Sequence, residues 1–241
     1  MTTNPDPRPA WEFIRDQLNG SSEPITIISL GGLTNLAQLL EQYPDSNWSN
    51  LQQIVIMGGA VFSDGNVSLL NNAMPAWDQG PAYSTNTYAE WNIFIDPLAA
   101  QKILRSTLPL TLVPLDACDY VLLDPGYINN ITAQDPVAQF AKNLLIKKSA
   151  GSTSEPIPVP IFDPLATLVA TLDLKHIRRE SFCLDVVLEE TSVDDHAGQT
   201  VIVENDGTLR PITVVTSASQ TEFETVYAQI MNGELVSKRQ G

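Results

Sequence analysis

The chain has 241 residues, of which 43% are hydrophobic, so it is long and apolar enough to bury a full core. Its formal net charge of −15 excludes nucleic acid and anionic membranes as partners, because the phosphates of either would be repelled. No apolar run reaches membrane-spanning length, and residues 1–7 have neither the basic nor the apolar region of a signal peptide.

A surface helix and the first half of a βαβ unit open the chain. Ala10 to Leu18 carries apolar residues at helical spacing. Ile25 to Leu30 is an apolar run typical of a buried strand, and Gly31-Gly32 predicts a turn after it. Thr34 is the expected N-cap of the helix that follows.

A second buried strand is predicted from Gln53 to Met57, and it ends in Gly58-Gly59. Glycines at this point allow a sharp turn with positive φ and let a ligand approach the main chain closely. The polar residues Asn66, Glu90 and Asn92 follow, and a carboxylate with two amides can bind the hydroxyls of a sugar. The alternative is an ordinary strand and turn, followed by a surface loop whose amides cap the backbone.

Residues 67–88 lie between these polar residues and show no clear periodicity. We interpret them as an insertion loop beside the expected pocket. A lid, an oligomer contact and a tolerated surface loop all fit such a segment.

Two further helices are predicted to begin with the same signal. Asp96-Pro97 and Asp163-Pro164 each combine a capping aspartate with a proline at the first helical position. Between them, Leu110 to Leu115 reads as a third strand. Three strand and helix units in series predict an α/β fold, with a three-layer, open, mostly parallel, Rossmann-like sheet. The remaining segments alternate like antiparallel strands and end in an amphipathic helix: Leu184 to Glu189, Thr200 to Val203, Ile212 to Thr216 and Thr221 to Met231.

Neither repeats nor a long Gly/Ser linker divides the chain, so we expect one domain over residues 1–241. Its two cysteines, Cys118 and Cys183, lie near predicted strands and fit buried thiols better than a disulfide or a zinc site. We therefore expect a reducing, cytoplasmic setting. The two histidines, His176 and His196, are expected at the surface or in caps.

Five short segments together resemble the nucleoside hydrolases, the inosine–uridine-preferring N-ribohydrolases. These are GGLTNLA from Gly31 to Ala37, IVIMGGAV, DGNV, AEWNIFIDPLAA, and FDPLA from Phe162 to Ala166, and they follow one another in the order typical of that family. The resemblance implies hydrolysis of the N-glycosidic bond of ribonucleosides, with a bound calcium ion as cofactor and a nucleoside as the binding partner.

The resemblance also implies roles for residues on the sugar side of such a site. Asn66, Glu90 and Asn92 would bind ribose hydroxyls, and Met57 would pack against the sugar. The local sequence alone favours a plain core position for Met57, and Glu90 fits an edge position equally well.

On the metal and base side, the resemblance makes Asp163 a ligand of the metal or of a hydroxyl, although a helix cap is the alternative. Cys118 takes the place of a threonine whose backbone carbonyl reaches calcium. Phe162 stands where the family has a histidine, and its ring can stack on a base but cannot protonate it.

The aspartate-rich calcium motif that the family has near its N-terminus is not found before Ile25. The acids there are Asp6, Glu12, Asp16 and Glu23, in a proline-rich tail and a surface helix. We therefore expect the chain to be N-terminally truncated relative to the family, with calcium weak or absent. Three hypotheses remain: a hydrolase completed by a homo-oligomer or a second chain that supplies aspartates, a degenerate ribose- or nucleoside-binding module, and a fragment of a longer enzyme.

Overall fold

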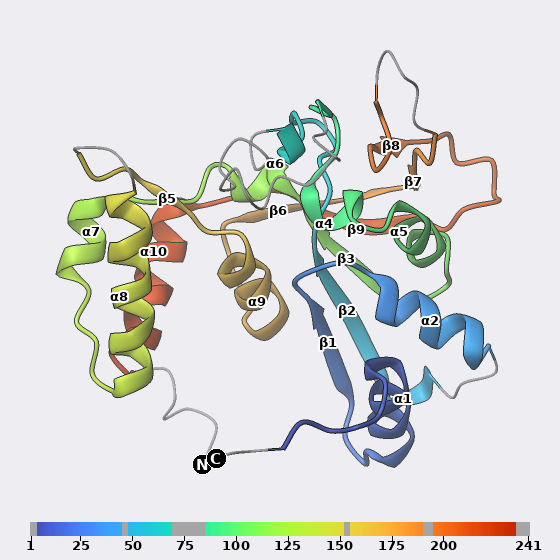
Figure 1. Ribbon diagram of the computed structural model, residues 1–241, viewed down its shortest axis with the longest axis horizontal. Helices are drawn as coiled ribbons and strands as arrows, with labels where there is room; N and C mark the ends of the chain where they lie inside the picture. Colours follow the sequence, from blue (N-terminus) through green and yellow to red (C-terminus); the bar gives the residue numbers. More distant parts are fainter. Residues whose placement is uncertain (1–3, 45–47, 69–84, 152–154, 190–194, 235–241) are drawn as a thin grey trace.

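The computed structural model describes residues 4–44, 48–68, 85–151, 155–189 and 195–234 (Figure 1). Most of the insertion predicted at residues 67–88 lies outside these ranges. Among the described residues, no helix is both long enough and apolar enough to cross a membrane.

A five-stranded sheet in the order β1-β2-β3-β9-β6 forms the centre of the fold. The first four strands run parallel to their neighbours, and β6 is antiparallel to β9. The predicted α/β fold with a mostly parallel sheet is confirmed. The strands are β1 (Ile25–Ser29), β2 (Leu51–Met57), β3 (Leu110–Val113), β9 (Ile212–Ala218) and β6 (Ile177–Phe182).

In the second half of β2, alternate residues are buried on opposite faces of the sheet, which is why the run from Ile54 to Met57 is apolar throughout. Ile54 and Ile56 belong to one hydrophobic core, and Val55 and Met57 belong to the other. The first core is covered by α1 (Ala10–Gly20), α2 (Thr34–Gln42) and α5 (Pro97–Leu104).

The second core is covered by α6, α9 and α10, and α7 and α8 pack outside it. Figure 1 shows α7, α8 and α10 standing together at one side of the molecule, with α1, α2 and α5 at the other. These helices are α6 (Leu115–Cys118), α7 (Pro125–Asn130), α8 (Pro136–Ala150), α9 (Asp163–Thr171) and α10 (Gln220–Met231). The remaining short elements are η1 (Trp48–Asn50), α4 (Trp91–Phe94), β4 (Leu122–Leu123), β5 (Val159–Pro160), β7 (Leu184–Val186) and β8 (Thr200–Ile202).

The C-terminal strands differ in part from the sequence prediction. β7 and β8 are an antiparallel pair, as expected. The segment predicted as an antiparallel strand from Ile212 to Thr216 is β9, which is antiparallel to β6 as expected but joins the main sheet parallel to β3. β6 was not predicted, because Arg178, Arg179 and Glu180 interrupt any apolar pattern.

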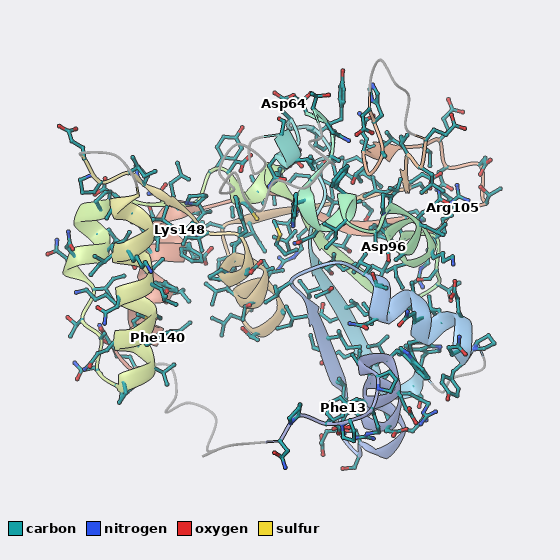
Figure 2. All side chains as sticks on the ribbon, viewed as in Figure 1. Phe13, Asp64, Asp96, Arg105, Phe140 and Lys148 are labelled. Atoms are coloured by element: carbon teal, nitrogen blue, oxygen red, sulfur yellow. The ribbon has the colours of Figure 1, made fainter. Side chains whose placement is uncertain are left out.

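Two of the three predicted helix caps are wrong. Thr34 is the first residue of α2 rather than its N-cap, and its hydroxyl donates to Asp96 Oδ2. Asp163 is likewise the first residue of α9, after Phe162. Asp96, labelled in Figure 2, caps α5 as predicted, accepting a hydrogen bond from the backbone N–H of Ala99.

Candidate functional site

The carboxyl ends of β1, β2 and β3 lie along one edge of the sheet. Ser29 is paired with Ile56, and Met57 with Val113, so the three strands end at neighbouring positions. In open α/β sheets, ligands bind in the crevice outside this edge. The residues that follow the strands are therefore the candidates for a site.

Glu90 is the central residue of this edge. It precedes α4 and is 2% exposed. Its Oε2 accepts hydrogen bonds from the backbone N–H groups of Gly59 at 3.0 Å, Asn92 at 2.9 Å and Ile93 at 3.3 Å. The other oxygen, Oε1, has no hydrogen-bond partner within the described ranges, so it is available to a ligand.

Burial raises the pKa of Glu90 to about 7, although the three N–H groups oppose this shift. The negative charge of Asp163 raises the pKa of Glu90 further. Near neutral pH this side chain is therefore divided between a carboxylate, which accepts hydrogen bonds, and a carboxylic acid, which also donates one.

Two segments that pack beside Glu90 contain glycines that the structure requires, Gly58-Gly59 and Gly65. Gly59 has φ of 86°, and a Cβ on Gly58 would lie 3.3 Å from Glu90 Oε2. A Cβ on Gly65 would lie 2.2 Å from the carbonyl oxygen of Ala89, so only glycine lets the two segments cross. The GG and DGN sequences thus allow main-chain segments to pack directly around the carboxyl group.

Both predicted asparagines form hydrogen bonds to main-chain atoms of the segments that surround Glu90. Asn92 Nδ2 donates to the carbonyl oxygen of Met57 at 3.1 Å and to its sulfur at 3.2 Å. Asn66 Oδ1 accepts from the backbone N–H of Trp91 at 2.9 Å. The interpretation as backbone-capping amides is thus correct for these atoms, while Asn92 Oδ1 and Asn66 Nδ2 have no partner in the described part of the chain.

Asp163 lies near this group without a hydrogen bond to it. The residue as a whole is exposed at the start of α9, and partial desolvation of its carboxyl group raises the pKa of Asp163. Its charge raises the pKa values of both Glu90 and Cys118, so the three side chains are electrostatic neighbours. Phe162 is half-buried and packs against the second core.

Cys118 is buried, as expected for a structural thiol, and burial raises the pKa of its thiol. Its carbonyl oxygen, predicted from the resemblance to reach calcium, accepts the N–H of Val121 at 3.0 Å. That hydrogen bond uses one lone pair of the oxygen within the turn after α6.

Two buried polar residues of this edge were missed by the sequence reasoning. Asp116 is 5% exposed, and its carboxylate accepts the N–H groups of Val61 at 2.8 Å and Phe62 at 2.6 Å. Asn86 is also buried, and its amide joins the residues before Glu90 to Ala197. An aspartate directly after the strand at Leu110 to Leu115 was a usable signal for Asp116, whereas nothing in the sequence distinguished Asn86.

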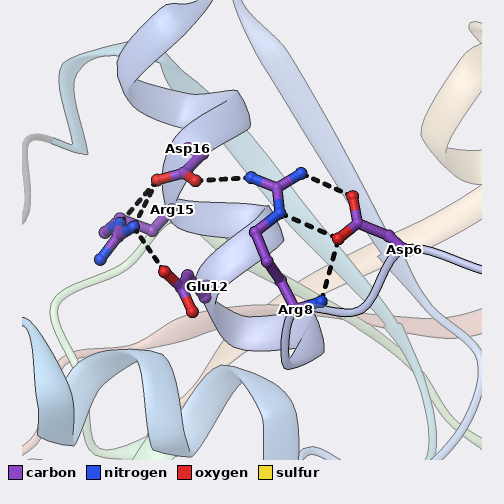
Figure 3. Close-up of polar contacts among 5 residues, drawn as sticks. All are labelled: Asp6, Arg8, Glu12, Arg15 and Asp16. Atoms are coloured by element: carbon purple, nitrogen blue, oxygen red, sulfur yellow. Dashed lines mark hydrogen bonds and ion pairs between the residues drawn. The ribbon is translucent and has the colours of Figure 1, made fainter.

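The described residues do not fit a complete calcium site. Calcium takes six to eight oxygen ligands. No group of three or more His, Cys, Asp or Glu side chains that could hold a metal occurs among the residues described. Figure 3 shows that Asp6, Glu12 and Asp16 are instead engaged in ion pairs with Arg8, which precedes α1, and with Arg15 on α1.

Comparison with known proteins gives consistent similarities. Residues 1–225 match the model of the family described as "Inosine-uridine preferring nucleoside hydrolase". The non-specific ribonucleoside hydrolase RihC of Salmonella enteritidis PT4 is 30% identical over 197 residues, which are 81% of this chain and 55% of the relative. RihC of Klebsiella pneumoniae subsp. pneumoniae is 34% identical over 147 residues, or 61% of this chain and 42% of the relative. The chain thus spans about half the length of the curated relatives it matches.

Two solved structures share the fold. The plant nucleoside hydrolase PpNRh1 has a TM-score of 0.77 at 18% identity, covering 96% of this chain and 69% of its own. An inosine-uridine preferring nucleoside hydrolase from Bacillus anthracis has a TM-score of 0.69 at 22% identity, covering 95% and 67% respectively.

Proposed function

The chain belongs to the inosine-uridine preferring nucleoside hydrolase family, and we propose on this basis that its crevice at the carboxyl edge of the sheet binds the ribose of a nucleoside. The reaction would be hydrolysis of the N-glycosidic bond of that nucleoside. Glu90, Asn92 and Asn66 are the proposed ligands of the ribose hydroxyls.

The observation that carries this proposal is that all three main-chain hydrogen bonds to the Glu90 carboxyl group go to one oxygen, Oε2. A buried carboxyl group needs partners for both of its oxygens, and here the main chain provides them only for Oε2. One ribose hydroxyl can donate to Oε1 while it accepts from Asn66 Nδ2, and a second hydroxyl can donate to Asn92 Oδ1. The main chain fixes Glu90 before any ligand arrives, so little ordering entropy is lost on binding.

Hydrolysis of a glycosidic bond passes through an oxocarbenium-like transition state and needs an activated water and help for the departing base. Calcium supplies the activated water when it is bound. Of the described residues we assign only Asp163 to such an ion, and Cys118 through its carbonyl is a weaker candidate. Because the fit is incomplete, we assign no catalytic step to the metal.

We further propose that this chain on its own is a poor hydrolase. Phe162 can stack on a base but has no proton to give, and Asp163 is one carboxylate where calcium needs several ligands. The second candidate function is a ribose- or nucleoside-binding module. It is favoured by Phe162, whose ring can stack on a base without assisting its departure. In either case, a homo-oligomer or a second chain remains the proposed source of further ligands.

Calorimetric titration with ribose, inosine and uridine tests the binding site. We expect Glu90→Gln and Asn92→Ala each to weaken binding at least tenfold, because each removes hydrogen bonds to hydroxyls worth about 1.5 kcal/mol or more. Glu23→Gln removes a surface carboxylate from the loop before β1 and should leave binding unchanged. Unchanged affinity in both site variants would contradict the proposed ribose site.

Release of free base, measured chromatographically with and without calcium, tests activity separately. We expect little release by the purified chain under conditions in which nucleoside binds. Efficient calcium-dependent release from inosine or uridine would show that the chain is a competent hydrolase and would overturn the proposed impairment.

A further inference from the structure

We propose that a second pocket, separate from the ribose crevice, binds a small organic cation. This cation pocket has a volume of about 190 Å³. It adjoins the loop that follows Gly59 and is lined by Phe62, Ser63, Asp116, Asp119, Tyr120 and Thr216, whereas Glu90 and the other proposed ribose ligands are not part of its lining.

Two of the residues that line this pocket are solvent-exposed aromatics. Phe62 is 63% exposed and Tyr120 is 70% exposed. The Phe62 ring packs edge-on against Phe182, with 5.5 Å between ring centroids and an interplanar angle of 73°. The face of an aromatic ring attracts a cation, and two such rings beside one cavity form the usual surroundings of an ammonium group.

The pocket carries negative charge that no basic residue neutralises. No lysine, arginine or histidine is among the described residues that line it. Both oxygens of Asp116 are used by the N–H groups of Val61 and Phe62, whereas the carboxylate of Asp119 has no partner among the described residues. Partial burial and the charge of Asp116 raise the pKa of Asp119, as expected for a carboxylate that lacks a compensating cation.

One residue that lines the cation pocket has a buried polar atom without a hydrogen-bond partner among the described residues. Ser63 Oγ is buried and has no hydrogen-bond partner within the described ranges, whereas the neighbouring hydroxyl of Thr216 donates to Glu180 at 3.2 Å. Buried hydroxyls normally have a partner. A ligand hydroxyl, the N–H of a primary ammonium group or an ordered water would supply one.

Size and chemistry together define the ligand class. A volume of about 190 Å³ corresponds to roughly six waters at about 30 Å³ each, so it admits a molecule of roughly six heavy atoms. A bare metal ion is a poor fit, because the Asp116 oxygens are occupied and aromatic rings are not metal ligands. The fitting class is a quaternary or primary ammonium compound, with its charge toward Asp119 and its methyl or methylene groups against Phe62 and Tyr120.

The test compares choline with 3,3-dimethylbutan-1-ol, its neutral isostere, by calorimetry or ligand-observed NMR on the full chain at constant ionic strength. No nucleoside is added, so the outcome does not depend on the proposed hydrolase function. We expect choline to bind in the millimolar range and the neutral alcohol to bind at least tenfold more weakly. Equal binding of the two compounds, or no binding of choline at 50 mM, would overturn the proposal.

Variants then locate the site. Asp119→Asn and Tyr120→Ala should each weaken choline binding about fivefold or more, in line with about 1 kcal/mol for a cation–π contact or a partly solvated ion pair. Phe62→Ala gives a second aromatic variant if Tyr120→Ala alters the melting temperature. Glu23→Gln removes the same charge elsewhere on the surface and should change affinity less than twofold. If Glu23→Gln weakens binding as much as Asp119→Asn, the attraction is only that of the net charge and the pocket assignment fails.

Discussion

Glu90 and Asp163 present the same chemical group at the same edge of the sheet, yet their surroundings are opposite. Glu90 is buried, and three main-chain N–H groups hold one of its oxygens. Asp163 is exposed at the start of α9, and none of the described residues donates a hydrogen bond to its carboxylate. The chain by itself therefore fixes the proposed sugar ligand, whereas the proposed metal ligand is held only by the backbone of its helix. The difference predicts that substitutions around Glu90 affect folding and that substitutions of Asp163 do not.

The largest effect is expected where backbone segments cross beside Glu90. In Gly65→Ala, the new Cβ would lie 2.2 Å from the Ala89 carbonyl oxygen, so one of the two segments must move. We expect the free energy of unfolding to fall by about 4 kcal/mol, measured by urea denaturation. Gly20→Ala is the matched control, because a Cβ there meets no atom within 4 Å. A loss below about 1 kcal/mol in Gly65→Ala would show that this crossing is not rigid.

The second prediction concerns pH. The pKa of Glu90 is raised from 4.5 to about 7 in the folded protein, so the folded state binds a proton that the unfolded state has released. The contribution of protonated Glu90 to stability is complete below pH 4.5 and is lost as the pH rises through 7. A shift of this size corresponds to about 3 kcal/mol.

Denaturant titrations of the parent chain and of Glu90→Gln between pH 4 and 8 measure this contribution. Glutamine cannot ionise, so the stability difference between the two proteins should change over that range, with the parent losing more stability as the pH rises. Parallel stability curves for the two proteins would mean that Glu90 has an ordinary pKa, and the comparison with Asp163 would lose its basis.

A third prediction uses Asp116, which is buried like Glu90. In Asp116→Ala, the N–H groups of Val61 and Phe62 lose their acceptor, and we expect a loss of about 2 kcal/mol in unfolding free energy. Asp119→Ala, three residues away, removes a carboxylate without a partner among the described residues and should change stability by about 0.5 kcal/mol or less. Equal losses in the two variants would indicate that the hydrogen bonds to the loop contribute little.

The smallest effect is expected at Asp163. Asp163→Asn removes only a charge from the first turn of α9, where desolvation of the charge and its attraction to the helix N-terminus oppose each other, so thermal denaturation should show a change of about 0.5 kcal/mol or less. Its proposed role concerns a cation, and the same variant should therefore weaken any calcium response of nucleoside binding. A large stability loss would mean that Asp163 is structural and would remove the contrast with Glu90.

The sequence was most informative where local pattern determines structure. The apolar runs before Gly31 and Gly58 predicted two parallel strands, because strands of a sheet covered on both faces are rich in apolar residues. The burial predicted for the first run is found only in part, since β1 is an edge strand whose residues are all partly exposed. The caps at Thr34 and Asp163 were misplaced by one residue, because the same residue types also occur in the first helical turn.

Contacts between residues far apart in the sequence were harder to predict. The direction of β9 depends on its pairing with β3, about a hundred residues earlier in the chain, and no local signal encodes that pairing. For the site, the polar residues could be named from resemblance, but the three N–H groups on one oxygen of Glu90 depend on where Gly59 is placed by the fold. Asn86 and Ser63 gained their significance only from burial.

The two outermost strands of the main sheet, β1 and β6, differ in how well they resist pairing with a strand of another molecule. β6 carries Arg178, Arg179 and Glu180, charges that disfavour edge-to-edge association. β1 at the other edge has the sequence ITIIS, without charge or proline, and its residues are all partly exposed. Such an edge is a template for aggregation, so a solution of this chain is expected to become turbid as its concentration rises. A lysine in place of Thr26 would give β1 the protection that β6 already has.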